Sequence, residues 1–139
     1  MTNNENLITA LERGRAKFAY ECVKEVLERN NTIQKEYRSY ARKIPSMILS
    51  SGLGQALAFV YSKNSRKEKE ESAYNVIYDQ LSRYMKSDIA VRIRAPKDRD
   101  LIDWVLSCDS YDYKYATQEI LSFFKWLRRF AEGMIKAED

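Results

Sequence analysis

YKYATQEILSFFKWLRRFAEGM, residues 113–134, is the stretch of sequence that decides the fold. Apolar or aromatic side chains recur in it at steps of three and four, at Tyr113, Ala116, Ile120, Phe123, Leu127, Phe130 and Met134. Such a stripe covers one face of a long helix and packs at small crossing angles against neighbouring helices. The segment therefore predicts a helix bundle in which Leu127 and Phe130 are buried.

Two helices are predicted in the first third of the chain. The first covers residues 4–29, with an inward face of Leu7, Leu11, Phe18, Cys22 and Val26. Asn31, with Gln34 three positions later, resembles an N-cap with its reciprocal partner, so a second helix should start there. Because Pro45 has no N–H to donate, we expect this helix to end or kink near Lys43 and a short turn to follow.

Three further helices are predicted between these and the last one. They cover residues 53–61, 66–86 and 101–106. Ser65 and Glu68 form a capping box for the middle one, whose inner face is Ala73, Ile77, Leu81 and Tyr84. The alternation of Ile89, Val91 and Ile93 predicts a short extended stretch, with a continued helix as the alternative.

The overall composition is that of a single helical domain. Of 139 residues, 45% are hydrophobic and 32% charged, which provides for both a core and a hydrated surface. Four glycines and two prolines are too few for the many tight turns of an all-β fold. We expect an all-α protein, a single compact bundle of about five to six helices over residues 1–139. The polar start MTNNEN and the lack of an apolar run near ~18 residues predict a cytoplasmic protein.

Catalytic chemistry is poorly supported by the residues present. Histidine is absent, which removes the usual general base and the commonest zinc ligand. Cys22 and Cys108 are isolated at apolar positions and are expected to be buried free thiols. Asp100 and Asp103 could share a divalent metal, but acids at this spacing more often stabilise the first turn of a helix. We therefore expect no enzymatic activity, no cofactor and no metal site.

A phosphate-binding loop is also excluded by the sequence. Gly52 and Gly54 have the spacing of two fingerprint glycines, but Leu57 occupies the third position and no Gly-Lys-Ser/Thr follows. A helix start at these glycines could still offer free N–H groups to a phosphate. The structural alternative is a glycine that only marks a helix boundary.

Positive charge is concentrated in one part of the chain. Residues 35–67 hold seven basic side chains against the single acid Glu36, a net charge of +6, whereas the whole chain carries +4. Such a basic surface can bind a polyanion, and the candidate residues, with two of the last helix in second place, are Lys35, Arg38, Arg42, Lys43, Lys63, Arg66 and Lys67, then Arg128 and Arg129. Acidic residues are concentrated over residues 100–112, at Asp100, Asp103, Asp109 and Asp112. The alternative interpretation is an ordinary solvated surface.

Two blocks of sequence resemble a known family. YRSYARKIPSMILSSGLGQALAFVYSK, residues 37–63, is similar to the signature of the small subunit of type III-B CRISPR-Cas (Cmr) RNA-guided effector complexes. YKYATQEILSFFKWLRRFAE, residues 113–132, resembles the closing helix of that family. Pro45, Gly52, Leu53 and Phe59 stand where the family pattern has proline, glycine-leucine and phenylalanine. The blocks cover about a third of the chain, and residues 68–112 carry no matching motif.

The resemblance implies a non-catalytic, all-α subunit of an antiviral complex. It implies that copies stack head to tail beside the other subunits and face the guide RNA and the target RNA. The main alternative is a helical protein-protein adaptor without nucleic-acid contact. A DNA-binding regulator is a third possibility, but it needs polar base-reading side chains on a recognition helix, and residues 52–61 are mostly apolar.

Overall fold

The computed structural model describes residues 3–63 and 71–137, and the regular secondary structure in these two ranges is entirely helical. Six helices follow one another along the described chain: α1 (Asn3–Val26), α2 (Asn31–Ser51), α3 (Leu53–Lys63), α4 (Ala73–Met85), α5 (Leu101–Ser107) and α6 (Ser110–Met134). The predicted all-α bundle is confirmed. Within the described ranges, none of these helices has the length and hydropathy needed to cross a membrane.

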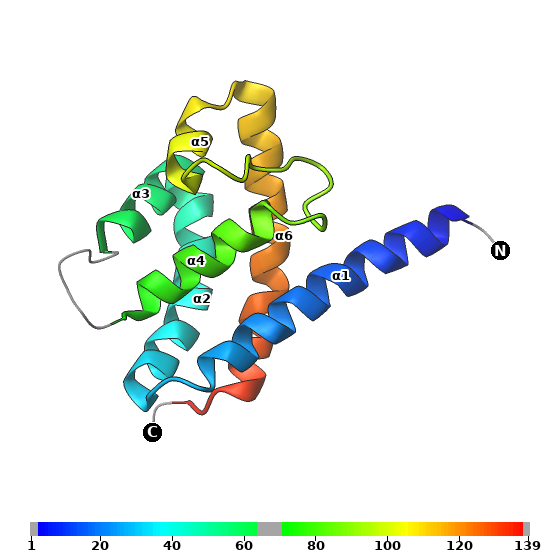
Figure 1. Cartoon of the computed structure of the whole chain (residues 1–139). Coiled ribbons are helices and arrows are strands. Elements are labelled where there is room, and N and C mark those ends of the chain that lie inside the picture. Colours follow the sequence, from blue (N-terminus) through cyan, green and yellow to red (C-terminus); the bar gives the residue numbers. More distant parts are fainter. Residues whose placement is uncertain (1–2, 64–70, 138–139) are drawn as a thin grey trace.

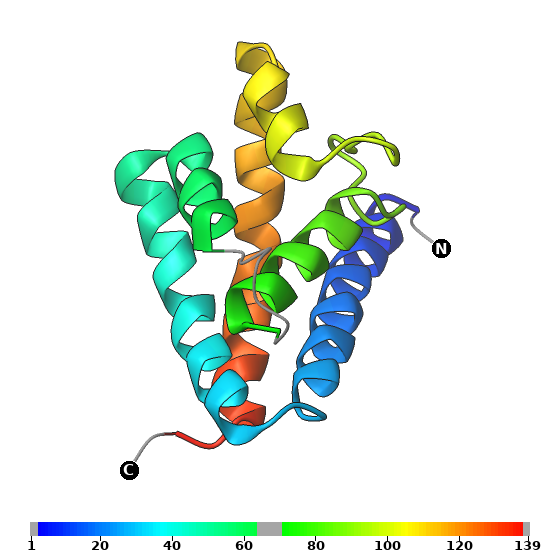
Figure 2. The same cartoon turned by 60° about the vertical axis from the view of Figure 1, so that its left-hand side comes forward.

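Helix α6 is the element around which the others assemble. It packs against α1, α2 and α4, and Figures 1 and 2 show it running the length of the molecule. Ala116, Ile120, Phe123 and Leu127 are fully buried, as the stripe predicts. Phe130 is only half-buried, because it lies at the edge of the core between the rings of Tyr20 and Trp126. The predicted burial of Phe130 is therefore wrong.

Helix α2 runs through the proline at which it was expected to end. Pro45 lies inside the helix, and the buried positions Ile33, Tyr37, Ala41, Ile44 and Ile48 continue across it at helical spacing. Packing on both sides of the proline holds the helix together despite the missing N–H. The start is also displaced by one residue: Asn30 is the N-cap, and its side chain accepts from the Ile33 N–H at 2.9 Å.

Helices α1 and α6 differ from prediction at their N-terminal ends. The first half of α1 projects beyond the bundle (Figure 1), and Leu7, expected on the inner face, is 67% exposed. Helix α6 starts three residues earlier than expected because the Asp109 side chain accepts from the Asp112 N–H at 2.8 Å and caps it. Of the two thiols, Cys22 is buried, whereas Cys108 is only partly buried.

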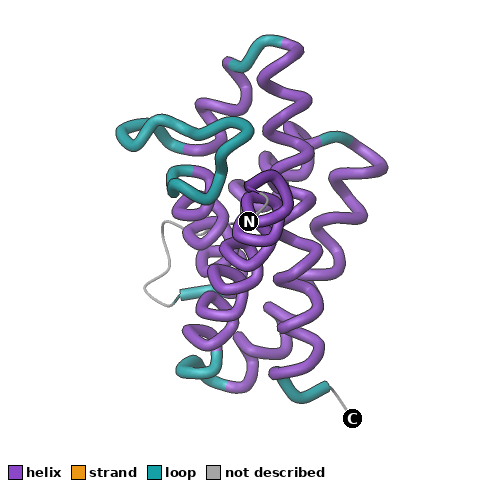
Figure 3. The backbone as a smooth tube through the Cα atoms, turned by 90° about the vertical axis from the view of Figure 1, so that its right-hand side faces the viewer, coloured by secondary structure: helices purple, strands orange, loops and turns teal. Residues whose placement is uncertain are grey.

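Helix α4 is shorter than predicted. It starts at Ala73 with Ser72 as N-cap and Asn75 as its reciprocal partner, and the predicted Ser65–Glu68 capping box lies outside the described residues. Its predicted inner face is confirmed, since all four of those residues are buried. Residues 86–100 form an irregular connection rather than an extended stretch, seen as a loop in Figure 3.

A buried ion pair joins three helices at the centre of the bundle. Arg15 of α1 contacts Glu119 of α6 at 3.1 Å, and the Tyr84 hydroxyl of α4 donates to the same carboxylate at 2.6 Å. The Tyr84 ring stacks on Phe123 with 4.3 Å between centroids, so the polar group is enclosed by aromatic packing. Buried charges are tolerated when they are paired and hydrogen-bonded in this way.

Candidate nucleic-acid interface

Basic side chains from α2 and the end of α6 converge on one side of the molecule. Lys35, Arg38 and Arg42 are spaced three and four apart, which places them on the same face of α2. They line a hollow with Ser39, Glu132 and Lys136, and Arg128 reaches Glu132 from α6. We call this surface the α2–α6 basic face and define it by Lys35, Arg38, Arg42, Arg128 and Lys136.

Glu132 connects the arginines of this face. Its Oε2 atom accepts from Arg42 Nη2 at 2.9 Å and from Arg128 Nε at 3.2 Å. Its backbone carbonyl accepts from Arg38 Nη2 at 3.5 Å, whereas Arg38 Nε is buried without a hydrogen-bond partner among the described residues. The hydrogen bonds from Arg42 and then Arg128 lower the pKa of Glu132, so the carboxylate is ionised at neutral pH.

Lys43 and Lys63 belong to a different cluster. Their ammonium groups lie 5.8 Å and 5.5 Å from the ring centroid of Phe59, in cation–π geometry. Lys43 diverges from Arg42 because consecutive helical residues point about 100° apart. We call Lys43, Lys63 and Phe59 the Phe59 cluster. The described basic residues of the predicted +6 stretch are therefore divided between two surfaces.

The remaining three predicted contact residues are two that the structure does not describe and one, Arg129, that joins neither surface. Arg66 and Lys67 lie outside the described residues. Arg129 is exposed on α6, directed away from Arg128 by the same turn of about 100° per residue. From the predicted set, the α2–α6 basic face brings together Lys35, Arg38, Arg42 and Arg128, and their contact with a nucleic acid stays a prediction.

The glycine and aspartate pairs have structural roles. Gly52 has φ +92°, which allows the sharp turn from α2 into α3, and the Gly54 N–H donates to the Tyr113 hydroxyl at 2.8 Å. Asp100 accepts from the Tyr78 hydroxyl, and Asp103 pairs with Arg99 at 2.7 Å. In residues 3–63 and 71–137, no group of three potential ligands could hold a metal ion.

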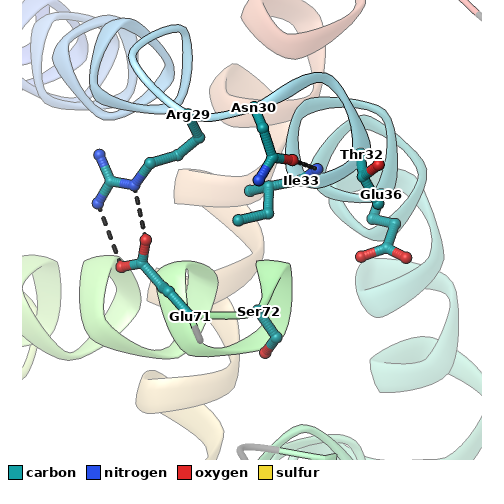
Figure 4. A pocket seen from close by; sticks show the side chains of 7 residues that line it. All are labelled: Arg29, Asn30, Thr32, Ile33, Glu36, Glu71 and Ser72. Atoms are coloured by element: carbon teal, nitrogen blue, oxygen red, sulfur yellow. Dashed lines mark hydrogen bonds and ion pairs between the residues drawn. The ribbon is translucent and has the colours of Figure 1, made fainter. Parts of the chain in front are cut away.

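A second hollow lies between the α1–α2 turn and the start of α4 (Figure 4). Arg29 donates to both oxygens of Glu71, at 2.7 Å and 3.2 Å, and this bidentate ion pair spans the hollow. Because these two charges neutralise each other, the hollow offers less attraction to a polyanion than the α2–α6 basic face does.

Sequence reasoning missed Glu132 and Lys136. The spacing of Arg128 and Glu132, four apart on one helix, could have identified that ion pair. The contact of Glu132 with Arg42 joins residues 90 positions apart and depends on how α2 packs against α6. No local pattern in the sequence reports it.

Comparison with known proteins gives consistent matches over nearly the whole chain. The family described as CRISPR-associated protein (Cas_Cmr5) matches residues 11–134. A curated relative, the CRISPR system Cmr subunit Cmr5 of Thermus thermophilus, is 29% identical over 121 residues, which are 87% of this chain and 92% of the relative. The crystal structure of a CRISPR-associated Cmr5 family protein from Thermus thermophilus superimposes with a TM-score of 0.70 and 27% identity. This structural match covers 90% of the present chain and 97% of that one.

Proposed function

The chain belongs to the Cmr5 family of CRISPR-associated proteins, and from this membership we propose that it is the small subunit of a type III-B Cmr effector complex. The Thermus relative is named as a subunit of a Cmr system, and it matches this chain over most of both lengths. Other subunits of an RNA-guided complex are therefore its partners, in the cytoplasm. Its role in antiviral defence is non-catalytic, a proposal supported by the absence of histidine.

The α2–α6 basic face is the observation that carries the RNA-binding part of the proposal. Among the residues that line its hollow, four are basic and one is acidic. Lysine and arginine side chains gathered in this way attract phosphates and release counterions without reading base sequence. We assign to this face contact with the backbone of guide or target RNA. Base pairing with the guide supplies the specificity.

Copies of the chain are proposed to stack head to tail. Asp109 and Asp112 lie at the start of α6 and Arg128 near its end, and a 25-residue helix is about 37 Å long. Exposed Leu106 and Tyr111 adjoin the acidic end. Opposite charge at the two ends favours a heterologous contact that repeats along a filament rather than closing into a dimer.

The experiment that tests this function replaces the three arginines around Glu132 in a reconstituted complex. The variant carries Arg38→Gln, Arg42→Gln and Arg128→Gln, and two quantities are measured: retention of the subunit in the complex and affinity for target RNA. We expect retention with weakened RNA binding. A protein-protein adaptor would behave in the opposite way, losing its place in the complex without a direct effect on RNA, and that result would refute the RNA assignment.

The DNA-regulator alternative finds no support in the helix it would need. Helix α3 buries Leu53, Ala56, Leu57 and Val60 against the bundle. A recognition helix must instead expose polar side chains to base edges in the major groove. We therefore retain the protein-protein adaptor as the only competing function.

A further inference from the structure

Glu132 is an acidic residue in an electrostatically unfavourable place. It lies in the last turn of α6, where the carbonyl groups of the helix end already carry partial negative charge. An acid there is normally destabilising by a few tenths of a kcal/mol. Its carboxylate is the only one among the described residues that line the hollow.

Two arginines from different helices compensate for this position. Arg42 and Arg128 contact the same carboxylate oxygen, which holds two positively charged groups next to each other. Without an anion between them, the two guanidinium groups would repel. The side chain of Arg42 is still 64% exposed, so its remaining N–H groups are accessible from solvent.

A carboxylate and a phosphate compete for the same donors. Both are oxygen anions that accept charge-assisted hydrogen bonds from a guanidinium, and phosphate is the ligand that the proposed function brings to this face. The side chain of Glu132 is 26% exposed and lies at the surface of the molecule. Because Arg42 and Arg128 are also exposed, an anion from solvent can reach them and compete with the carboxylate.

We propose that Glu132 is an internal counter-ion that occupies, in the free subunit, the position of an RNA phosphate between Arg42 and Arg128, and that RNA displaces it. The inference rests on the proposed function, because it assumes that this face contacts RNA. It adds a regulatory element to that contact: Glu132 competes with the RNA phosphate, lowers the affinity of this face for RNA and keeps the two arginines together until RNA arrives.

The test compares Glu132→Gln with Glu36→Gln in the reconstituted complex. Both variants remove one negative charge, but Glu36 lines the other hollow and serves as the matched control. Removing a charge about 6 Å from a bound phosphate should tighten target-RNA binding roughly threefold at low salt. Glu36→Gln should leave the dissociation constant within error. Unchanged or weaker binding by a folded Glu132→Gln variant would overturn the inference.

The triple arginine variant separates this inference from the function on which it rests. If that variant binds RNA as the wild type does, the RNA assignment itself fails. If it binds weakly while Glu132→Gln behaves as wild type, only the counter-ion role fails. A second readout is the side-chain Nε–H NMR signal of Arg128 in the full-length subunit. Addition of an oligoribonucleotide should shift it in the wild type, and an unmoved signal in RNA-bound protein would overturn the displacement.

Discussion

Helix α6 carries two glutamates that bind arginines of other helices, and their surroundings differ completely. Glu119 is 0% exposed and meets Arg15, itself only 4% exposed, whereas Glu132 meets Arg42 and Arg128 at the surface. In the interior, water cannot replace a lost partner. At the surface, solvent or a ligand can replace it. The comparison indicates that burial, rather than the identity of the charged groups, separates a structural pair from one available for binding.

The surroundings of Arg15 illustrate the structural case. Burial acts to lower the pKa of Arg15, yet its hydrogen bond with Tyr84 and the charge of Glu119 raise the pKa overall. The guanidinium therefore stays charged inside the bundle and depends on its partners. At the other pair, Arg42 and Arg128 still face solvent, and their charge remains available to a phosphate.

The largest effect is expected from removing the buried acid. Glu119→Ala leaves Arg15 charged and without its main partner, which should lower the free energy of unfolding by about 3–5 kcal/mol. Urea denaturation followed by circular dichroism measures it. As a control, Arg15→Met combined with Glu119→Leu removes both charges and should cost much less. A loss below about 1 kcal/mol for Glu119→Ala would show that the pair is not structurally important.

The next largest loss of stability is expected from truncating two apolar residues that lie between these glutamates on α6. Leu127 is fully buried, so Leu127→Ala should lower the free energy of unfolding by roughly 2–5 kcal/mol. Phe130 is half-buried, and Phe130→Ala should cost less than Leu127→Ala, because part of its ring already contacts water. Denaturant melts of the two variants, measured side by side, check the order. A larger loss for Phe130→Ala than for Leu127→Ala would contradict the position of Phe130 at the edge of the core.

The surface acid should affect stability only slightly. Glu132→Gln should change the free energy of unfolding by no more than about 1 kcal/mol. Because the folded-state pKa of Glu132 is lowered, its contribution is present above the unfolded pKa and is lost as pH falls through the folded value. Wild type and variant should therefore converge in stability at acidic pH. A difference that grew on acidification would contradict this sign.

No effect is expected in an assay for cleavage. The purified subunit should not cut RNA or DNA with any divalent ion, because Asp100 and Asp103 are engaged by Tyr78 and Arg99. Incubation of labelled RNA with the wild type and with an Asp100→Asn, Asp103→Asn variant measures this. Reproducible cleavage by the wild type, lost in the variant, would contradict the non-catalytic role.

The sequence was sufficient where local periodicity determines structure. Helical spacing located all six described helices because burial of one face recurs every three to four residues. It failed at Pro45, where tertiary packing outweighs a local rule, and at Leu7, which stays 67% exposed on the part of α1 that projects from the bundle. The helix starts after Ser72 and Asp109 depend on side-chain caps, a reciprocal pair with Asn75 at Ser72 and one hydrogen bond at Asp109, and the sequence offers several possible caps nearby.

The candidate site could be predicted only in part from the sequence. Charge counting found the basic stretch, but it grouped Lys43 with Arg42, which face different surfaces. A net charge does not say which way each side chain points. That depends on the position of the residue around the helix and on how α2 packs against α6. The role of Glu132 depends on a contact between residues 90 positions apart and could not be predicted.

The salt dependence of RNA binding tests the central claim most directly. The dissociation constant for target RNA is measured in the reconstituted complex over a range of salt concentrations. The wild type is compared with the Arg38, Arg42, Arg128 variant and with a control that also loses three basic charges, Arg92→Gln, Arg94→Gln and Lys97→Gln. Each phosphate contact contributes a log-log slope of roughly −0.7 on single-stranded nucleic acid.

We expect the slope to be flattened by about two units in the arginine variant, if all three arginines make contact, and to be unchanged in the control. Equal slopes in the wild type and the arginine variant would contradict this expectation, since the α2–α6 basic face would then not contact the RNA backbone.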